Sequence, residues 1–245
     1  MIMNRQTFTL TLREARMIAP GVRHLAFTRE DGANLNYIPG QFITVHIDTD
    51  TGIARRSYSI ASIPGQSAYI EIAVSYVEGG LATELFANLA IGDVLTASGP
   101  FGRLILRDEQ PKRYFLIATG TGVTPYRAML PELAQRLNNQ PELSVVVLFG
   151  TRTREDLLYS ADFLEFAKQQ PRFSYRACYS RMQPETDYEC QGYVQNIFDE
   201  FKPDPENDIF YLCGNPNMID ASFAKLTELG FPSQNVRREK YVSSK

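Results

Sequence analysis

The sequence predicts a two-domain β plus α/β protein. Its first part reads as a six-stranded antiparallel barrel of Greek-key type with one short helix, and its second as a doubly wound parallel α/β sheet. Residues 1–102 contain short strand patterns separated by turn pairs, whereas residues 103–245 alternate strand and helix patterns. The boundary belongs near residues 100–112, where the stretch 107–112 is polar and linker-like, and we place it between residues 102 and 103.

In the first domain, six segments alternate or run apolar and are rich in β-branched and aromatic residues. Turn pairs such as Pro20-Gly21 and Pro39-Gly40 separate them. The expected strands are 7–14, 22–28, 41–47, 57–60, 69–76 and 93–98, with a single helix over 82–88. Six strands with one helix indicate a small antiparallel barrel.

In the second domain, residues 143–149 are a near-continuous apolar run, which is typical of a parallel strand covered on both faces. The expected strands are 114–118, 143–149, 173–179, 209–213 and 236–242, and the expected helices are 126–137, 161–169, 193–201 and 217–229. This alternation predicts a doubly wound parallel sheet.

Composition argues against several classes of function. A net charge of −3 and a pI near 5.5 give no basic excess for binding nucleic acid. No apolar run approaches the roughly 18 residues of a membrane helix. The first residues also lack the apolar core of a signal peptide, so we expect a cytoplasmic protein without membrane association.

Cysteine and histidine are too sparse for metal chemistry. The three cysteines, Cys178, Cys190 and Cys213, lack CxxC spacing, and the only histidines are His24 and His46. We therefore expect neither an iron–sulfur cluster nor another metal site. Cys178 and Cys190 are candidates for a bridge, but in a reducing compartment we expect free thiols.

The most informative motif is Arg56-Ser-Tyr-Ser59, at the end of an expected strand. Arg56 offers a planar fork for a diphosphate, and Tyr58 lies on the same side of the strand as a ring for stacking. Ser59 adds a hydroxyl. The alternative interpretation is a polar strand with a surface arginine pair.

Two glycine-rich turns precede expected helices. Gly79-Gly80 opens a helix with Thr83 in its first turn, and Gly120-Thr-Gly122 follows a strand. Glycines let the backbone approach an anion, and helix-terminal amides can then hold a pyrophosphate. Thr124 is expected to cap the second helix, with Pro125 as its first residue. Either turn alone is also compatible with an ordinary strand-to-helix connection.

The second domain carries candidate groups for a nucleotide 2′-phosphate. Arg152, the pair Ser180-Arg181 and the segment Tyr193-Val-Gln195 follow expected strands, and no acidic residue stands where a ribose diol would need one. A hydroxyl and guanidinium groups favour NADP over NAD, and Tyr193 can stack on adenine. The alternative is a solvated loop and a core aromatic residue.

Cys213 ends an expected parallel strand, at the edge where α/β sites assemble. It is also explained as a small buried hydrophobic residue. The C-terminal residues include Glu239 and Tyr241, followed by four more residues. Their alternative interpretation is a frayed terminus.

Taken in order, these motifs resemble those of the ferredoxin–NADP reductase superfamily. The segment Leu212-Cys-Gly-Asn-Pro-Asn-Met218 is similar to the bacterial ferredoxin (flavodoxin)–NADP reductases. The resemblance covers nearly the whole chain and implies FAD on the first domain and NADP(H) on the second. One departure is Tyr193, where the bacterial members carry an arginine in a Gly-Arg pair.

The resemblance also implies roles for single residues. Ser59, Cys213 and Glu239 would position the reacting groups and handle protons, and Tyr241 would cover the flavin, with the C-terminal tail returning to it. The residues implied for FAD are Arg56, Tyr58, Ser59, Ile60, Ala73, Val74, Gly79, Gly80, Leu81, Ala82, Thr83, Thr121 and Tyr241. The residues implied for NADP are Gly120, Gly122, Val123, Arg152, Ser180, Arg181, Tyr193, Gln195, Gly214, Asn215 and Met218.

The implied activity is that of a flavoenzyme passing hydride between nicotinamide C4 and flavin N5, and single electrons to a separate ferredoxin or flavodoxin. An NAD(P)H–flavin oxidoreductase or the reductase component of an oxygenase is an alternative. A non-enzymatic redox-sensing protein on the same fold is a third. We expect a monomer. The basic residues expected to dock an acidic carrier are Arg55, Lys112, Arg113, Arg127, Arg237 and Arg238.

Overall fold

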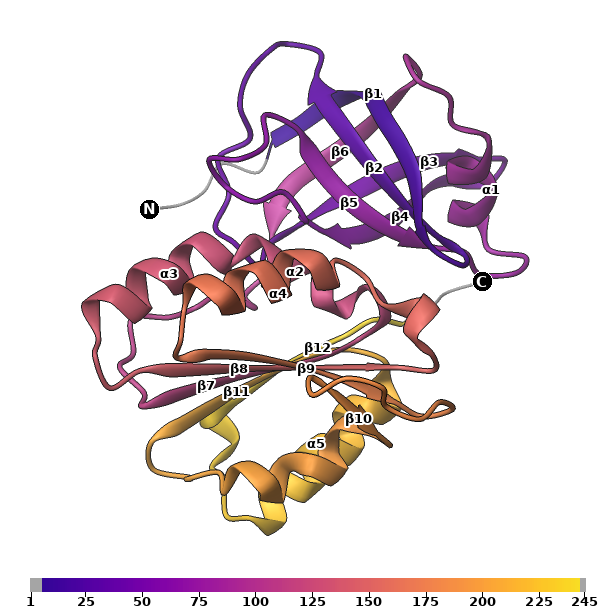
Figure 1. Ribbon diagram of the computed structural model, residues 1–245. Coiled ribbons are helices and arrows are strands. Elements are labelled where there is room, and N and C mark those ends of the chain that lie inside the picture. The colour runs from indigo at the N-terminus through magenta and orange to yellow at the C-terminus, as the bar shows by residue number, and fades with distance from the viewer. Residues whose placement is uncertain (1–5, 243–245) are drawn as a thin grey trace. The chain divides into compact units, whose positions relative to one another are not determined.

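The computed structural model describes residues 6–242 and divides into two compact units, shown in Figure 1. The barrel unit contains residues 6–106 together with Thr124–Met129. The α/β unit contains Arg107–Val123 and Leu130–Val242. Within the described residues, no helix is long and apolar enough to cross a membrane.

The barrel unit is a six-stranded antiparallel sheet with the strand order β4-β3-β6-β1-β2-β5. Strand β6 pairs with both β1 and β3, so the strands do not follow chain order. An isolated bridge between Ile60 and Ile72 joins the two edges of the sheet. The elements are β1 (Gln6–Ala19), β2 (Val22–Arg29), β3 (Phe42–Thr49), β4 (Gly52–Ser59), β5 (Ile70–Ser75), α1 (Leu81–Asn88) and β6 (Val94–Phe101).

The core of the barrel unit is mostly aliphatic, with Leu10, Leu25, Ile43 and Ile72 fully buried. Helix α1 contributes Phe86, whose ring makes an edge contact with Tyr58 at 5.2 Å between centroids. In β6 the buried positions alternate with exposed or half-buried ones, whereas the middle of β2 and most of β5 are buried on both faces.

The α/β unit is a six-stranded sheet of parallel pairs in the order β10-β9-β8-β7-β11-β12. Figure 1 shows α3 and α4 on one face of this sheet and α5 on the other. Its strands are β7 (Arg113–Thr119), β8 (Ser144–Thr151), β9 (Phe173–Tyr179), β10 (Glu189–Gln191), β11 (Asp208–Gly214) and β12 (Val236–Lys240). Its helices are η1 (Gly120–Val123), α3 (Leu130–Asn139), η2 (Arg154–Asp156), α4 (Ser160–Gln169), η3 (Val194–Phe201), α5 (Pro216–Glu228) and η4 (Ser233–Asn235).

The helix expected over 126–137 is divided in the structure. The chain forms the 3₁₀ turn η1, then the short helix α2 (Thr124–Ala128) and then α3. Pro131 has no backbone N–H to continue the hydrogen bonds of α2, so the helix restarts there. The expectation of a Thr124 cap is wrong, because Thr124 is itself the first residue of α2 and its buried Oγ1 has no partner among the described residues.

Helix α2 belongs to the barrel unit through Arg127. One guanidinium nitrogen donates to the carbonyl oxygen of Ala61 at 2.7 Å and to Oε2 of Glu71 at 2.6 Å. Two smaller differences from expectation lie in the α/β unit, where β10 is an unexpected short strand and residues 194–201 form a 3₁₀ rather than an α-helix.

Candidate functional site

Strand β4 places the predicted diphosphate and stacking groups on one side. Val45 pairs with Arg56 and Ile43 with Tyr58, so both side chains stand on the side of the buried β3 residues. Arg56 donates only to the neighbouring carbonyl of Arg55, and no acidic side chain of residues 6–242 pairs with it. A half-buried arginine without a counter-charge fits a diphosphate.

Tyr58 is held against the barrel core. Burial raises the pKa of its phenol to about 12, although the nearby Arg56 acts in the opposite direction. The hydroxyl is therefore neutral at ordinary pH. The neighbouring Ser59 is only 5% exposed and ends β4. The other predicted strand residues, Ile60, Ala73 and Val74, are buried as well.

The turn before α1 leaves helix amides available. Gly80 is the N-cap of α1, and no side chain caps the helix there. Gly79 has φ +70°, and a Cβ on it would meet nothing within 4 Å. The predicted residues Leu81 and Ala82 open the first turn, while the Thr83 hydroxyl already accepts from the N–H of Val77 at 2.8 Å. An uncapped helix start behind an open glycine fits a pyrophosphate.

In the α/β unit, the turn after β7 is packed against the end of β11. A Cβ on Gly122 would lie 2.3 Å from the carbonyl oxygen of Cys213 and 2.7 Å from the Cα of Gly214. Gly120, by contrast, has φ +54° and open space around the missing Cβ. The predicted residue Val123 is buried and Thr121 half-buried. The first glycine thus faces open space, and the second permits close packing.

Gly214 completes this packing from the β11 side. It has φ +122°, and a Cβ there would lie 2.4 Å from the carbonyl oxygen of Thr119. The hydroxyl of Thr119 accepts a hydrogen bond from the N–H of Asn215 at 3.0 Å. The carboxyl ends of β7 and β11 are therefore fixed to each other. Thr119 takes part in this contact, although the sequence motifs did not predict it as a site residue.

The structure brings two of the three predicted catalytic residues together. Cys213 and Glu239 are in-register partners on the parallel strands β11 and β12. Complete burial, with Glu239 nearby, raises the pKa of the Cys213 thiol well above its ordinary value. The N–H of Tyr241 donates to the carbonyl oxygen of Gly214 at 2.8 Å, so the predicted aromatic residue also lies at this strand end. Cys213 therefore remains a neutral thiol.

Two residues predicted to contact NADP make contacts within the α/β unit itself. The Asn215 side chain accepts from the N–H of Asn217 at 2.8 Å and caps α5, with Pro216 as the first helical residue. Met218 packs in the apolar core of the α/β unit and receives a hydrogen bond from Ser222 at 3.6 Å. Asn215 is an exposed residue, although its backbone N–H donates to Thr119 and its carbonyl oxygen accepts from the N–H of Ile219.

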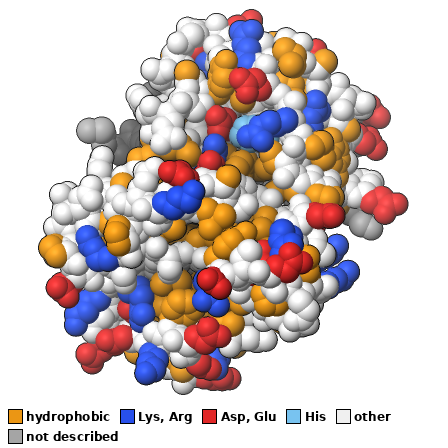
Figure 2. All heavy atoms as spheres, viewed as in Figure 1, with side chains coloured by type: hydrophobic (Ala, Val, Ile, Leu, Met, Phe, Trp, Pro, Cys, Tyr) orange, Lys and Arg blue, Asp and Glu red, His pale blue; other side chains and the backbone are white. Residues whose placement is uncertain are grey.

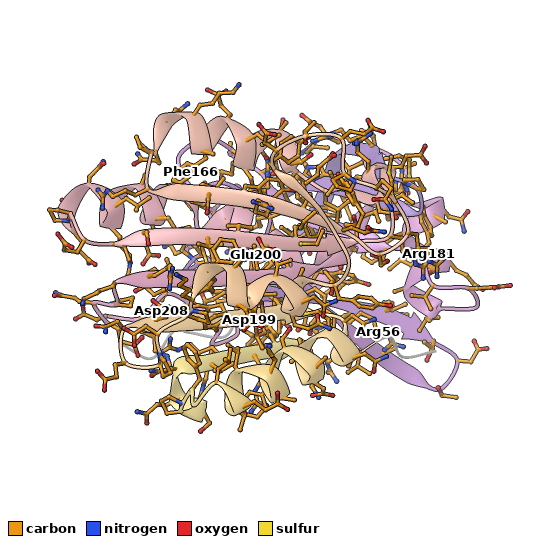
Figure 3. All side chains as sticks on the ribbon, turned by 60° about the horizontal axis from the view of Figure 1, so that its bottom comes forward. Arg56, Phe166, Arg181, Asp199, Glu200 and Asp208 are labelled. Carbon is orange, nitrogen blue, oxygen red and sulfur yellow. The ribbon has the colours of Figure 1, made fainter. Side chains whose placement is uncertain are left out.

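The groups predicted for a 2′-phosphate meet at the carboxyl ends of β8 and β9. The N–H of Ser180 donates to the carbonyl oxygen of Thr151, and the N–H of Arg181 to that of Arg152, both at 3.0 Å. Figure 3 shows Arg181 at the opposite end of the sheet from Asp208, which begins β11. Arg152 and Arg181 are exposed, and neither pairs with an acidic group of the described chain, which fits an anionic ligand.

The end of β10 supplies the remaining predicted groups. The N–H of Gly192 donates to the carbonyl oxygen of Tyr179 at 2.8 Å, which holds this end beside β9. Tyr193 follows with 63% of its surface exposed. Gln195 Oε1 is buried without a hydrogen-bond partner among the described residues. We call Arg152, Ser180, Arg181 and Tyr193 the nucleotide clamp.

An ion pair between the partly exposed Arg154 and the buried Glu189 was not predicted. Glu189 accepts hydrogen bonds from Arg154 Nε and Nη2 at 2.8 Å each, and from the Tyr179 hydroxyl at 2.9 Å. It also accepts from the N–H of Glu185 at 2.7 Å. This network closes the loop that begins with Ser180. The sequence carries no signal for it, because the participants come from separate segments.

Three of the six cations expected to dock an acidic carrier are neutralised within the chain. Arg113 pairs with Asp208, Arg127 with Glu71 and Arg237 with Glu109. On the face shown in Figure 2, Lys and Arg side chains are interspersed with Asp and Glu. The exposed members of the expected set are Arg55, Lys112 and Arg238.

Two family models match the chain. Residues 9–105 match the oxidoreductase FAD-binding domain, and residues 116–223 match the oxidoreductase NAD-binding domain. We call the predicted FAD residues of the barrel unit and the predicted NADP residues of the α/β unit the two half-sites. Together with them, these matches define the class as an FAD- and nicotinamide-nucleotide-binding oxidoreductase.

A ferredoxin–NADP reductase B from Sorangium cellulosum (strain So ce56) is 33% identical over 96% of this chain and 98% of its own length. The chain therefore belongs to the ferredoxin–NADP reductase family. The electron transfer component of toluate 1,2-dioxygenase from Pseudomonas putida is 28% identical over 86% of the chain, which spans 60% of that protein.

Solved structures agree on the fold. An Amycolatopsis cytochrome P450 reductase has a TM-score of 0.83 and 29% identity, with 98% of this chain and 71% of that chain covered. A ferredoxin NADP+ reductase from Neisseria gonorrhoeae with bound FAD and NADP has a TM-score of 0.82 at 19% identity, covering 96% and 98% of the two chains. The predicted two-domain fold and membership of the family are confirmed.

Proposed function

We propose that this chain is an NADPH-dependent reductase that exchanges electrons with a separate ferredoxin or flavodoxin. The observation that carries the proposal is the nucleotide clamp, in which Ser180 and Arg181 are tied to the strand end that carries Arg152. Two exposed guanidinium groups without acidic partners support recognition of a 2′-phosphate, which NADP has and NAD lacks. The Sorangium relative named for this activity supports it further.

We further propose that residues 1–102 hold FAD and residues 103–245 hold NADP(H). Arg56 and the amides before α1 would grip the FAD pyrophosphate, and Tyr58 would stack on the ring. The chemistry that bound FAD supplies is acceptance of a hydride and release of single electrons. The chain itself binds, orients and excludes water.

Ser59, Cys213 and Glu239 are the proposed groups for positioning and proton handling. A buried, neutral Cys213 suits packing beside a nicotinamide and does not suit nucleophilic attack. Tyr241 is proposed to cover the flavin. Residues 243–245, which complete the proposed returning tail, lie outside the described residues. We also propose a monomeric, cytoplasmic protein.

Steady-state kinetics with NADPH and NADH test the proposal. Arg181→Ala and Arg152→Ala are each expected to raise KM for NADPH about tenfold or more, because a charge-assisted hydrogen bond contributes roughly 1.5–3 kcal/mol. KM for NADH should not change. Arg107→Ala removes an equal charge from an exposed position of the same unit and serves as control. A tenfold preference of the wild-type enzyme for NADH would refute the proposal.

Reductase components of oxygenases are a second candidate, since the toluate dioxygenase relative is of that kind. Stopped-flow oxidation of the reduced enzyme by the host's ferredoxins, flavodoxins and oxygenase components would separate these partners. An NAD(P)H–flavin oxidoreductase would instead lose its yellow colour on gel filtration. A protein that reduces no dye with NADPH and added FAD would favour a redox sensor.

A further inference from the structure

Cys178 and Cys190 are direct neighbours in the α/β unit. They are in-register partners on the parallel strands β9 and β10, so their side chains project from the same face of the sheet. Neighbouring strands lie about 4.8 Å apart, which falls within the Cα separation of about 4.4–6.8 Å that a disulfide requires. Both are free cysteines, Cys178 fully buried and Cys190 8% exposed. The sequence made them candidates for a bridge, but a separation of twelve residues did not show that they would be in register on neighbouring strands.

The surroundings make the two thiols unequal. A hydrogen bond from Cys178 lowers the pKa of Cys190, and Arg176 acts in the same direction, whereas the same bond raises the pKa of Cys178. Glu200 of η3, labelled in Figure 3, opposes ionisation of either thiol. Cys190 also lies on the edge strand β10 and is the more exposed of the two, so it is the better nucleophile and Cys178 the resolving thiol.

Arg176, beside the two cysteines, has a buried N–H that lacks an acceptor within residues 6–242, which is an independent indication that this site binds or forms an anion. It precedes Cys178 by two residues on β9 and so stands on the same face of the strand. Its Nε is buried without a hydrogen-bond partner in the described chain. A Cys190 thiolate would give this N–H an acceptor. The neutral thiol instead donates weakly to the carbonyl oxygen of Ala177 at 3.4 Å.

We infer that Cys178 and Cys190 form a redox-active dithiol that a peroxide converts to a reversible disulfide. The Cys190 thiolate attacks one peroxide oxygen, so an S–O bond forms, the O–O bond breaks and hydroxide leaves as water after taking a proton. The Cys178 sulfur then attacks the sulfenic sulfur, so the S–S bond forms and the S–O bond breaks, and its proton leaves with the second water. Two thiols are oxidised by two electrons, and one peroxide is reduced to two waters.

Burial selects the oxidant class. Cys190 is on β10, at the edge of the sheet, and its small exposed fraction admits a two-oxygen molecule more readily than a peptide disulfide. Cys213 lies on β11, separated from β9 by two strands, and is completely buried. It has no thiol neighbour on β7 or β12, its two partner strands.

The disulfide acts on the nucleotide clamp, and this step rests on the proposed function. Ser180 follows Cys178 by two residues, and Tyr193 follows Cys190 by three. The spacing of the two strands already suits a disulfide, so the sulfur atoms reach the bond length of about 2.05 Å when both side chains turn toward each other. The bond fixes the two cysteines in one geometry and constrains the clamp groups that follow them on each strand, so oxidation weakens binding of NADPH.

The test uses the full chain with FAD bound, reduced with dithiothreitol, freed of it and treated with hydrogen peroxide. Thiol titration in denaturant should show loss of two of the three thiols. Mass spectrometry should show a Cys178–Cys190 cross-link with a free Cys213, and dithiothreitol should reverse it. The dissociation constant of NADPH should rise about fivefold or more on oxidation and recover on reduction.

Cys178→Ala and Cys190→Ala are the matched controls, and peroxide should leave the NADPH affinity of either variant unchanged. Because oxidised and reduced wild-type protein are compared directly, the test stands even if a variant fails to fold. Three surviving thiols, or oxidation of Cys190 without a cross-link, would overturn the dithiol. A cross-link with unchanged NADPH affinity would overturn its coupling to the clamp. Equal affinity of the reduced enzyme for NADPH and NADH would instead contradict the proposed function, and the cross-link would still decide the dithiol.

Discussion

The two nucleotide half-sites are built in opposite ways. In the barrel unit, Tyr58 packs on the core and Ser59 and Val74 are buried, so the predicted flavin contacts belong to the packed strands. In the α/β unit, the side chains of Arg152 and Arg181 are exposed, and they stand on loops at strand ends rather than on packed strands.

This difference indicates different tasks for the two half-sites. Buried contacts lose little further side-chain entropy on binding, so they suit a cofactor that stays bound. Exposed arginines are ordered only when a ligand arrives, which suits a substrate that must leave after each turnover. We therefore expect the barrel unit to retain FAD and the α/β unit to exchange NADP(H). The variants below test this contrast, together with the thiol and clamp experiments above.

The largest effect is expected at the rigid turn of the α/β unit. Gly122→Val places a side chain 2.3 Å from a backbone oxygen, and backbone cannot move aside as a side chain would. We expect a loss of about 3 kcal/mol or more in the free energy of unfolding. Urea unfolding measures this loss.

Gly120→Asn is the matched control, because that position is open and asparagine tolerates a left-handed backbone. NADPH binding should vanish in the Gly122 variant and survive in the control. Equal stability of the two variants would contradict the close packing of η1 against β11.

The buried carboxylates of the two units should give the next largest effect. Glu189→Gln removes the charge that Arg154 pairs with, and we expect a loss of about 2 kcal/mol at neutral pH, because Arg154 is itself partly exposed. The hydrogen bonds from Arg154 lower the pKa of Glu189 from 4.5 to about 2. A lowered folded-state pKa stabilises above 4.5 and loses that contribution as the pH falls toward 2.

The stability gap between wild type and Glu189→Gln should therefore close on acidification, which urea unfolding at a series of pH values measures. Glu71→Gln is the counterpart in the barrel unit. Burial raises the pKa of Glu71, but hydrogen bonds from Ser67 and Arg127 outweigh it and lower the pKa. Only the Glu189 variant should also raise KM for NADPH, since Glu189 closes the loop of the nucleotide clamp. A gap that stays constant with pH would show that the lost stability does not come from the charge.

The smallest effect separates two adjacent arginines of the barrel unit. Arg56→Ala should weaken FAD binding about tenfold, because a charge-assisted contact to phosphate is lost while the buried contacts remain. Arg55→Ala, on the opposite and exposed side of β4, should leave FAD binding unchanged. Fluorescence titration of the apoprotein with FAD measures both. Equal effects of the two substitutions would contradict the assignment of Arg56 to the diphosphate.

Much of the fold followed from local patterns. Alternating strands with glycine turns predicted the barrel, and the apolar run at 143–149 predicted a central parallel strand. Helix periodicity alone did not reveal the break at Met129. Periodicity reports the spacing of apolar residues, whereas the break follows from the missing backbone N–H of Pro131. The short strand β10 escaped prediction since three residues carry no measurable period.

The predicted site divides in the same way. Arg56, Tyr58, Ser180 and Arg181 were visible because their residue types and spacing carry the chemistry of phosphate and ring binding. The partners of Glu189 were not, because Arg154 and Tyr179 meet it only across strands. The same holds for the expected docking cations Arg113 and Arg237, whose carboxylate partners are far away in the chain.

The sequence by itself determined the two-domain fold, the two glycine-rich turns and the family to which the chain belongs, because periodicity and glycine spacing are local properties. Tertiary structure decided which side chains keep a free charge and which are neutralised within the chain. It also placed Cys213 beside Glu239, and Cys178 beside Cys190, since register between strands depends on the packing of the whole sheet.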